Sequence, residues 1–162
     1  MGVLQSVPPA LRWRATDEAT RREWLDRAAV ALDLVGLRKL QHERTSLLSY
    51  GQRKLLDLAR VVASLPSLAL LDEPLAGIGD SYGYVTKVID FLKARGCAIL
   101  LVEHNMRFVM DACDEITVLN TGRIIACGGR TQILNDPEVL AAYLGPGIAS
   151  RREAEPSRDR VG

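Results

Sequence analysis

Residues 47–74, LLSYGQRKLLDLARVVASLPSLALLDEP, constrain the fold more than any other part of this chain of 162 residues. A polar, glycine-containing start precedes a helical pattern, and a short apolar run then ends in Asp72 and Glu73. Continuous apolar runs of this length are typical of strands buried on both faces of a parallel sheet. The segment therefore predicts an α/β fold with acidic groups at the carboxyl end of a strand, where such sheets bind their ligands.

The helix in this segment is predicted to begin at Ser49, because Ser49 and Gln52 form the S-x-x-Q pattern of a capping box. Gly51 allows a ligand to approach the backbone closely, and a helix N-terminus attracts phosphate through its free N–H groups. Apolar residues recur at helical spacing, as expected for one buried face: Leu55, Leu56, Ala59, Val62 and Ala63. From these residues alone, an ordinary capped amphipathic helix is the alternative.

A second apolar run, residues 97–102, predicts another buried strand, and Glu103 and His104 follow at its end. The adjacent carboxylates of Asp72 and Glu73 are costly to keep ionised unless a cation or solvent compensates their charge. A magnesium–nucleotide site would supply that cation. Taken singly, each group has an alternative interpretation. The acidic pair could be two solvated acids at a strand end, and His104 could be a structural or solvent-facing histidine.

The remaining pattern predicts short elements in regular order. A helix capped by Thr16 or Asp17 ends at Gly36 and carries the apolar residues Leu25, Ala28, Leu32 and Val35. Downstream we expect helices over 81–94 and 106–112, a hairpin of 115–119 and 123–126 around Asn120-Thr121-Gly122, and a last helix from Asp136-Pro137. The predicted organisation is a linker over 1–15, a helical subdomain over 16–66, the α/β core over 67–147 and a disordered tail over 148–162.

Together these segments resemble the ATP-binding subunits of ABC transporters, from about residue 16 to residue 145. LSYGQ resembles the signature motif, and LALLDEP resembles the Walker B strand. The LSYGQ form, the segment VEHNMRFVMDACDEITVLNTGRIIACGG and the ending NDPEVLAAYLG are typical of the branched-chain amino acid importer group. The ATPases of urea importers are the next most similar group.

The resemblance implies a role for each matching residue. Asp72 would hold Mg²⁺ through water, Glu73 would orient or activate the attacking water, and His104 would be the switch histidine that contacts the γ-phosphate of ATP. The signature, Ser49, Tyr50, Gly51 and Gln52, would close over an ATP held by a second ATPase subunit. Gly79 and Asp80 match the D-loop, with Gly79 standing where the family usually has Asp or Asn.

The chain contains no G-x-x-x-x-G-K-[ST] sequence, the loop that holds most of the triphosphate in such ATPases. The expected fold is therefore the C-terminal half of a P-loop NTPase domain with its helical signature subdomain. We expect this truncated chain to bind ATP weakly and to be inactive alone. The resemblance also implies a dimer of ATPase subunits, integral membrane permease subunits, and an extracytoplasmic solute-binding protein as an indirect partner.

Composition gives no independent reason to expect another class of partner. The net charge is +1 with 25% charged residues, which makes no electrostatic case for nucleic acid or an anionic membrane. No apolar stretch approaches the ~20 residues that span a bilayer, and no signal peptide is evident. Three cysteines without C-x-x-C spacing indicate reduced thiols in the cytosol. Membrane association is thus expected to be peripheral, at the inner face, through permease subunits.

Two alternatives from other classes are left open by the residues. Residues 77–83, GIGDSYG, follow a strand and open a helix, as a dinucleotide-binding loop does, and Glu103 stands about twenty residues beyond the last glycine, where such folds place an acidic residue. Its third glycine is one position late, and Asp72, Glu73 and Asp80 would crowd negative charge onto a pyrophosphate. The second alternative is a non-catalytic interaction module that pairs with a complete ABC ATPase.

Overall fold

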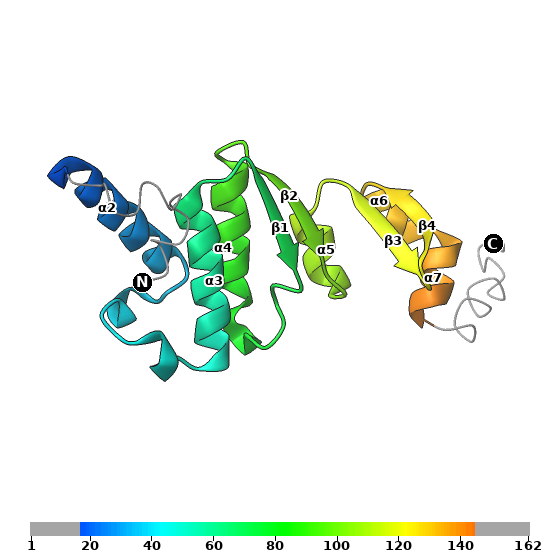
Figure 1. Ribbon diagram of the computed structural model, residues 1–162. Helices are drawn as coiled ribbons and strands as arrows, with labels where there is room; N and C mark the ends of the chain where they lie inside the picture. Colours follow the sequence, from blue (N-terminus) through cyan, green and yellow to red (C-terminus); the bar gives the residue numbers. More distant parts are fainter. Residues whose placement is uncertain (1–16, 145–162) are drawn as a thin grey trace, which may run out of the picture. The chain divides into compact units, whose positions relative to one another are not determined.

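The computed structural model describes residues 17–144, and the chain divides into two compact units between His104 and Asn105. The predicted linker over 1–15, the tail over 148–162 and the capping candidate Thr16 lie outside the described residues. The first unit contains α2 (Glu18–Leu34), η2 (Arg38–Leu40), η3 (Thr45–Leu47), α3 (Tyr50–Ser64), β1 (Leu68–Asp72), η4 (Gly79–Ser81), α4 (Tyr82–Lys93) and β2 (Ala98–Val102) (Figure 1).

Helix α2 begins after Asp17, whose carboxylate accepts hydrogen bonds from the Thr20 backbone N–H at 2.6 Å and from the Thr20 hydroxyl at 2.7 Å. The helix ends before Gly36, which adopts a φ of +71° that glycine tolerates without a steric penalty. The predicted apolar stripe is wrong for Leu25, which is exposed. Burial concentrates in the C-terminal half of the helix, around Ala31 and Val35.

Strands β1 and β2 pair in parallel, with Leu68 opposite Ala98 and Asp72 opposite Val102. Helix α4 packs on β2 and also contacts α3, so the helices cover one face of the strand pair (Figure 1). On that face of β1, Ala69 and Leu71 are buried. The structure therefore confirms both strands and the helix near 81–94, with ends shifted by one residue for β2 and α4.

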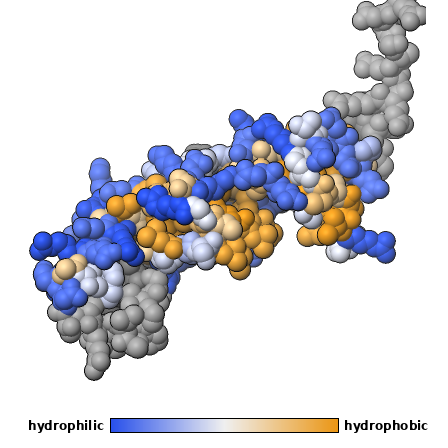
Figure 2. Space-filling model, turned by 90° about the horizontal axis from the view of Figure 1, so that it is seen from above, coloured by the Kyte–Doolittle hydropathy of each residue, from blue (hydrophilic) through white to orange (hydrophobic). Residues whose placement is uncertain are grey.

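The prediction that β1 is buried on both faces is wrong for the described residues. Alternate residues of both strands are exposed on the face opposite α4: Leu68, Leu70, Leu100 and Val102. In Figure 2, hydrophobic residues, coloured orange, lie on the surface in the middle of the view. The sequence run is apolar on both sides, but within residues 17–144 helices pack against one side only.

The second unit is a hairpin packed with three short helices. It contains α5 (Met106–Ala112), β3 (Ile116–Asn120), β4 (Arg123–Gly128), α6 (Arg130–Asn135) and α7 (Pro137–Leu144). Thr121 and Gly122 both have positive φ, 46° and 78°, as expected for a two-residue hairpin turn. The core of this unit consists of Val109, Met110, Ile116, Ile133 and Val139.

The structure confirms the predicted helix over 106–112, the hairpin and the last helix from Pro137, but it adds α6, which the sequence pattern did not predict. Helix α6 is only 6 residues long, and its one buried residue, Ile133, gives little periodicity to detect. No helix among residues 17–144 is long and apolar enough to cross a lipid bilayer.

Candidate functional site

The acidic pair lies at the carboxyl end of β1. Asp72 is the last residue of the strand, and the Glu73 backbone N–H donates to the Val102 carbonyl at 2.9 Å, which extends the parallel pairing by one bond. Glu73 itself has a φ of +43°, a left-handed conformation that is rare for a residue with a Cβ. Strained backbone of this kind is concentrated at functional sites.

His104 follows β2 at the same edge of the sheet. Its Nδ1 lies 3.6 Å from Oε1 of Glu73, although the imidazole is 80% exposed. The carboxyl ends of the two parallel strands thus bring together two residues that the sequence places far apart. The exposed side chains of this pair are accessible to a ligand at the strand ends.

Glu103 lies at the same edge, and the sequence pattern predicted a role for it only in the dinucleotide-binding alternative. Its side chain is 1% exposed, and one carboxylate oxygen accepts the Leu75 backbone N–H at 3.0 Å. The other oxygen accepts the backbone N–H of His104, also at 3.0 Å. Strand alternation places this side chain on the face opposite that of exposed Val102, but the sequence of the strand, apolar at every position, does not indicate which face is covered.

The predicted signature residues form the N-terminus of α3, and the predicted capping box is confirmed. The Ser49 hydroxyl accepts the Gln52 backbone N–H at 3.2 Å, and the Gln52 side chain accepts the Ser49 N–H at 2.9 Å. Within residues 17–144, the N–H groups of Tyr50 and Gly51 have no acceptor. Two unpaired donors at the positive end of a helix of 15 residues can bind an anionic oxygen.

The signature packs against the turn that follows the acidic pair. A Cβ on Gly51 would lie 3.1 Å from the carbonyl oxygen of Gly77, and a Cβ on Gly77 would overlap the Tyr50 ring. Gly77 also has a φ of +74°, so both its backbone and its surroundings require glycine. Gly79, with a φ of +52°, and the backbone of Asp80 begin η4 directly after this turn.

The donor set is consistent with magnesium held jointly with a nucleotide. Residues 17–144 contain no group of three or more His, Cys, Asp or Glu side chains that could hold a metal ion unaided. Mg²⁺ commonly uses one or two carboxylates and takes its other ligands from water and substrate phosphates. The carboxylate of Asp72, at the strand end, fits that pattern.

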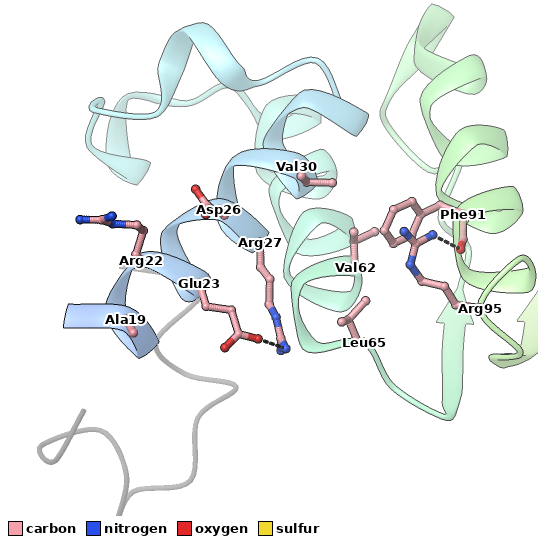
Figure 3. A pocket seen from close by; sticks show the side chains of 10 residues that line it. All are labelled: Ala19, Arg22, Glu23, Asp26, Arg27, Val30, Val62, Leu65, Phe91 and Arg95. Carbon is pink, nitrogen blue, oxygen red and sulfur yellow. Dashed lines mark hydrogen bonds and ion pairs between the residues drawn. The ribbon is translucent and has the colours of Figure 1, made fainter. Parts of the chain in front are cut away.

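A separate hollow of about 540 Å³ lies between α2, the end of α3 and α4 (Figure 3). Charged side chains from α2 line one side of it, and Arg95 stacks on the Phe91 ring at 3.5 Å on the other. None of the predicted site residues lines this hollow, and its mixture of opposite charges makes it unsuited to a triphosphate.

Two family models match parts of this chain. The family model described as ABC transporter matches residues 3–76, which include the signature and the acidic pair. The model described as branched-chain amino acid ATP-binding cassette transporter matches residues 123–145.

Three relatives illustrate the similarity. The high-affinity branched-chain amino acid transport ATP-binding protein LivG of Escherichia coli (strain K12) is 40% identical over 85% of this chain and 52% of LivG. BraF of Pseudomonas aeruginosa, with the same description, is 36% identical over 78% of this chain and 50% of its own. The lipopolysaccharide export system ATP-binding protein LptB of Haemophilus influenzae is 38% identical over 65% and 46%. The chain thus spans about half the length of the curated relatives it matches.

Solved structures agree with the fold. An ATP-binding cassette of an ABC transporter in its ADP conformation superposes with a TM-score of 0.61 at 27% identity, over 88% of this chain and 62% of the other. A nucleotide-free ATP-binding cassette gives a TM-score of 0.62 at 28% identity, over 90% and 63%.

Proposed function

Because this chain belongs to the family of ABC transporter ATP-binding proteins, we propose that it supplies the signature and hydrolysis residues of an ATPase that drives solute import. The observation that carries the proposal is the approach of Glu73 to His104, 3.6 Å, at the carboxyl ends of two parallel strands. Ligands of α/β sheets bind at this edge.

Each residue at the strand ends has a separate proposed role. Asp72 would hold Mg²⁺, which would supply positive charge against the phosphates. Glu73 orients the attacking water for in-line displacement, and His104 contacts the γ-phosphate from the neighbouring strand. The exposure of both Glu73 and His104 supports this division, because each side chain can reach a nucleotide outside the sheet edge.

The signature residues Ser49 to Gln52 act on a different nucleotide, the one held by a second ATPase subunit. The unpaired N–H groups of Tyr50 and Gly51 support a phosphate contact, and the capping box fixes their direction. Gly79 and Asp80, in the D-loop, would contact the same partner subunit. This arrangement requires a dimer of ATPase subunits.

We propose branched-chain amino acids, or a similar small polar solute, as the transported class. The family match over 123–145 and the similarity to LivG and BraF support this class, while the similarity to LptB names lipopolysaccharide export as the competing one. Permease subunits in the membrane and, indirectly, a solute-binding protein are the proposed partners. The ATPase would then lie on the cytoplasmic face, bound to the permease.

The test is a chimera in which the unmatched N-terminal part of LivG is joined to this chain. We expect magnesium-dependent ATP hydrolysis, with Glu73→Gln cutting the rate by about 10²-fold or more, the scale of a lost acid–base group, and leaving ATP affinity nearly unchanged. Glu43→Gln, the same substitution at an exposed position, is the matched control. Loss of ATP binding in Glu73→Gln, or hydrolysis that is indifferent to it, would refute the assigned role.

The alternative, a non-catalytic interaction module, predicts another result. Such a chain would co-purify stoichiometrically with a complete ABC ATPase, and the Glu73→Gln variant of the chimera would hydrolyse ATP as fast as its parent. Both measurements can be made on the same preparations.

A further inference from the structure

We propose that Glu103 is a positioning residue that fixes the turn after the acidic pair to the backbone of His104. This inference rests on the proposed function for its consequence, since the groups it aligns are Glu73 and His104. The hydrogen bonds themselves can be tested without any nucleotide.

The burial of Glu103 requires an explanation. A carboxylate that loses its water is costly unless hydrogen bonds replace it. The Glu103 side chain is 1% exposed, and each of its two oxygens accepts a different backbone N–H at 3.0 Å, one from Leu75 and one from His104. Hydrogen bonds to an ionised acceptor are among the strongest in proteins.

The two donors belong to the two segments that form the proposed site. Leu75 belongs to the turn that begins at Glu73, and this turn is closed by a hydrogen bond from the Ala76 N–H to the Glu73 carbonyl at 3.0 Å. His104 is the other member of the 3.6 Å pair. One buried side chain thus connects the segment that presents Glu73 with the residue that presents the imidazole.

The turn needs such a restraint because the Glu73 backbone is in the left-handed region, with φ +43°. A residue with a Cβ adopts this conformation only when the surrounding structure imposes it. The Val102 carbonyl holds the Glu73 N–H, and Glu103 holds the turn two residues later. Both anchors come from the end of β2.

A carboxylate suits this position and an amide does not. Two N–H donors need two acceptor oxygens, and Glu supplies both. In Glu103→Gln one oxygen becomes an NH₂ group that would face an N–H donor, so one of the two bonds is lost. In Glu103→Asp both oxygens remain, but the side chain is one methylene shorter and cannot span the same two donors.

The experiment measures amide hydrogen exchange in the full chain, without nucleotide, for the parent, Glu103→Gln and Glu43→Gln. We expect exchange at Leu75 or His104 to become about tenfold faster or more in Glu103→Gln, as for loss of a hydrogen bond to a charged group. The control substitution Glu43→Gln, at an exposed position, should leave the exchange rates of both amides unchanged. The imidazole ¹⁵N resonances of His104 should also move in Glu103→Gln, at fixed pH, while those of His42 do not.

A measurement on the unchanged chain covers the case in which Glu103→Gln does not fold. Scalar couplings across the hydrogen bonds should connect the amide nitrogens of Leu75 and His104 to the carboxyl carbon of Glu103. Absence of both couplings, or unchanged exchange and unchanged His104 resonances in a folded Glu103→Gln, would overturn the proposal. These outcomes are independent of ATP hydrolysis, so failure of the proposed function alone would leave them as predicted.

In the chimera with LivG, the consequence for catalysis can be read separately. Glu103→Gln should lower kcat more than it raises KM. The substitution disturbs the alignment of Glu73 and His104, but it removes no contact to the nucleotide. A rise in KM alone, with kcat unchanged, would contradict the positioning role.

Discussion

At the scale of single residues, the turn after β1 depends on backbone conformation at Glu73 and Gly77. Glu73 and Gly77 both have positive φ in the same turn; Glu73 carries a Cβ there, whereas a Cβ added to Gly77 would overlap the Tyr50 ring. The Tyr50 ring of the signature covers Gly77, so a contact between two predicted motifs depends on the absence of one carbon atom. The identity of Tyr50 in the signature is therefore coupled to the residue at position 77.

Gly77→Ala should destabilise the protein by roughly 1–3 kcal/mol, because it adds both left-handed strain and overlap with Tyr50. Gly83→Ala is the matched control, since Gly83 lies in α4 with open space around it and alanine favours a helix. Thermal unfolding of both variants measures the difference. The double variant with Tyr50→Ala should recover part of the loss; equal melting of the two single variants would contradict the predicted overlap.

At the scale of elements, the helix starts are set by short-range caps. Ser49 and Gln52 each accept the other's backbone N–H at the start of α3, and the Asp17 carboxylate accepts the Thr20 N–H at the start of α2. These bonds join residues three apart, so they can form before the rest of the fold. They also fix where each helix presents its positive end.

Ser49→Ala should lower the free energy of unfolding by about 1 kcal/mol, the usual effect of losing a side-chain cap. Ser67→Ala, at an exposed bend between α3 and β1, should change it little. Denaturant unfolding followed by circular dichroism gives both values. If the two substitutions have the same effect, the capping bond at Ser49 contributes nothing measurable.

The cap of α2 should depend on pH. Hydrogen bonds from the Thr20 N–H and hydroxyl hold the pKa of Asp17 below its ordinary value near 3.8. Because the pKa of Asp17 is lower in the folded state, the cap stabilises α2 fully at pH values above the ordinary pKa. That stabilisation is lost as the pH falls through the pKa of the folded state. The Thr20 amide resonance should report this titration, and Asp17→Asn, which caps without titrating, should abolish it. A Thr20 amide that titrates equally in both would refute the assignment.

At the scale of the whole molecule, one face of the strand pair lacks a covering layer among residues 17–144. Leu68, Leu70, Leu100 and Val102 are 55–68% exposed on it. Exposed apolar strands with unpaired edges favour aggregation. The length of the relatives gives a reason for the uncovered face, because the chain spans about half of each.

We expect the isolated chain to be marginally stable and to bind a hydrophobic dye. Replacing Leu70 and Leu100 by Thr should reduce dye fluorescence and aggregation, since threonine retains strand propensity while removing apolar surface. Leu47→Thr, at a residue 71% exposed in η3, is the control for a single exposed leucine away from the strands. A monomeric parent with a cooperative melt and no dye binding would show that this face is covered.

The sequence alone determined the features that depend on neighbours along the chain. The capping box at Ser49, the helix over 106–112, the strand at 68–72 and the turn at Thr121-Gly122 all follow from patterns a few residues long. The resemblance carried by the motifs also identified the family and the ends of β1 and β2 as the candidate site, since parallel strands present their carboxyl ends at one edge.

Only the tertiary structure decided which side chains meet and which faces are covered. Glu103 reaches Leu75 across 28 residues of sequence, and no local pattern encodes a hydrogen bond over that separation. The one-sided burial of β1 likewise depends on which helices pack against it. An apolar run states that a strand can be buried on both faces, whereas the covering layer comes from distant segments, and so the sequence of the strand cannot specify it.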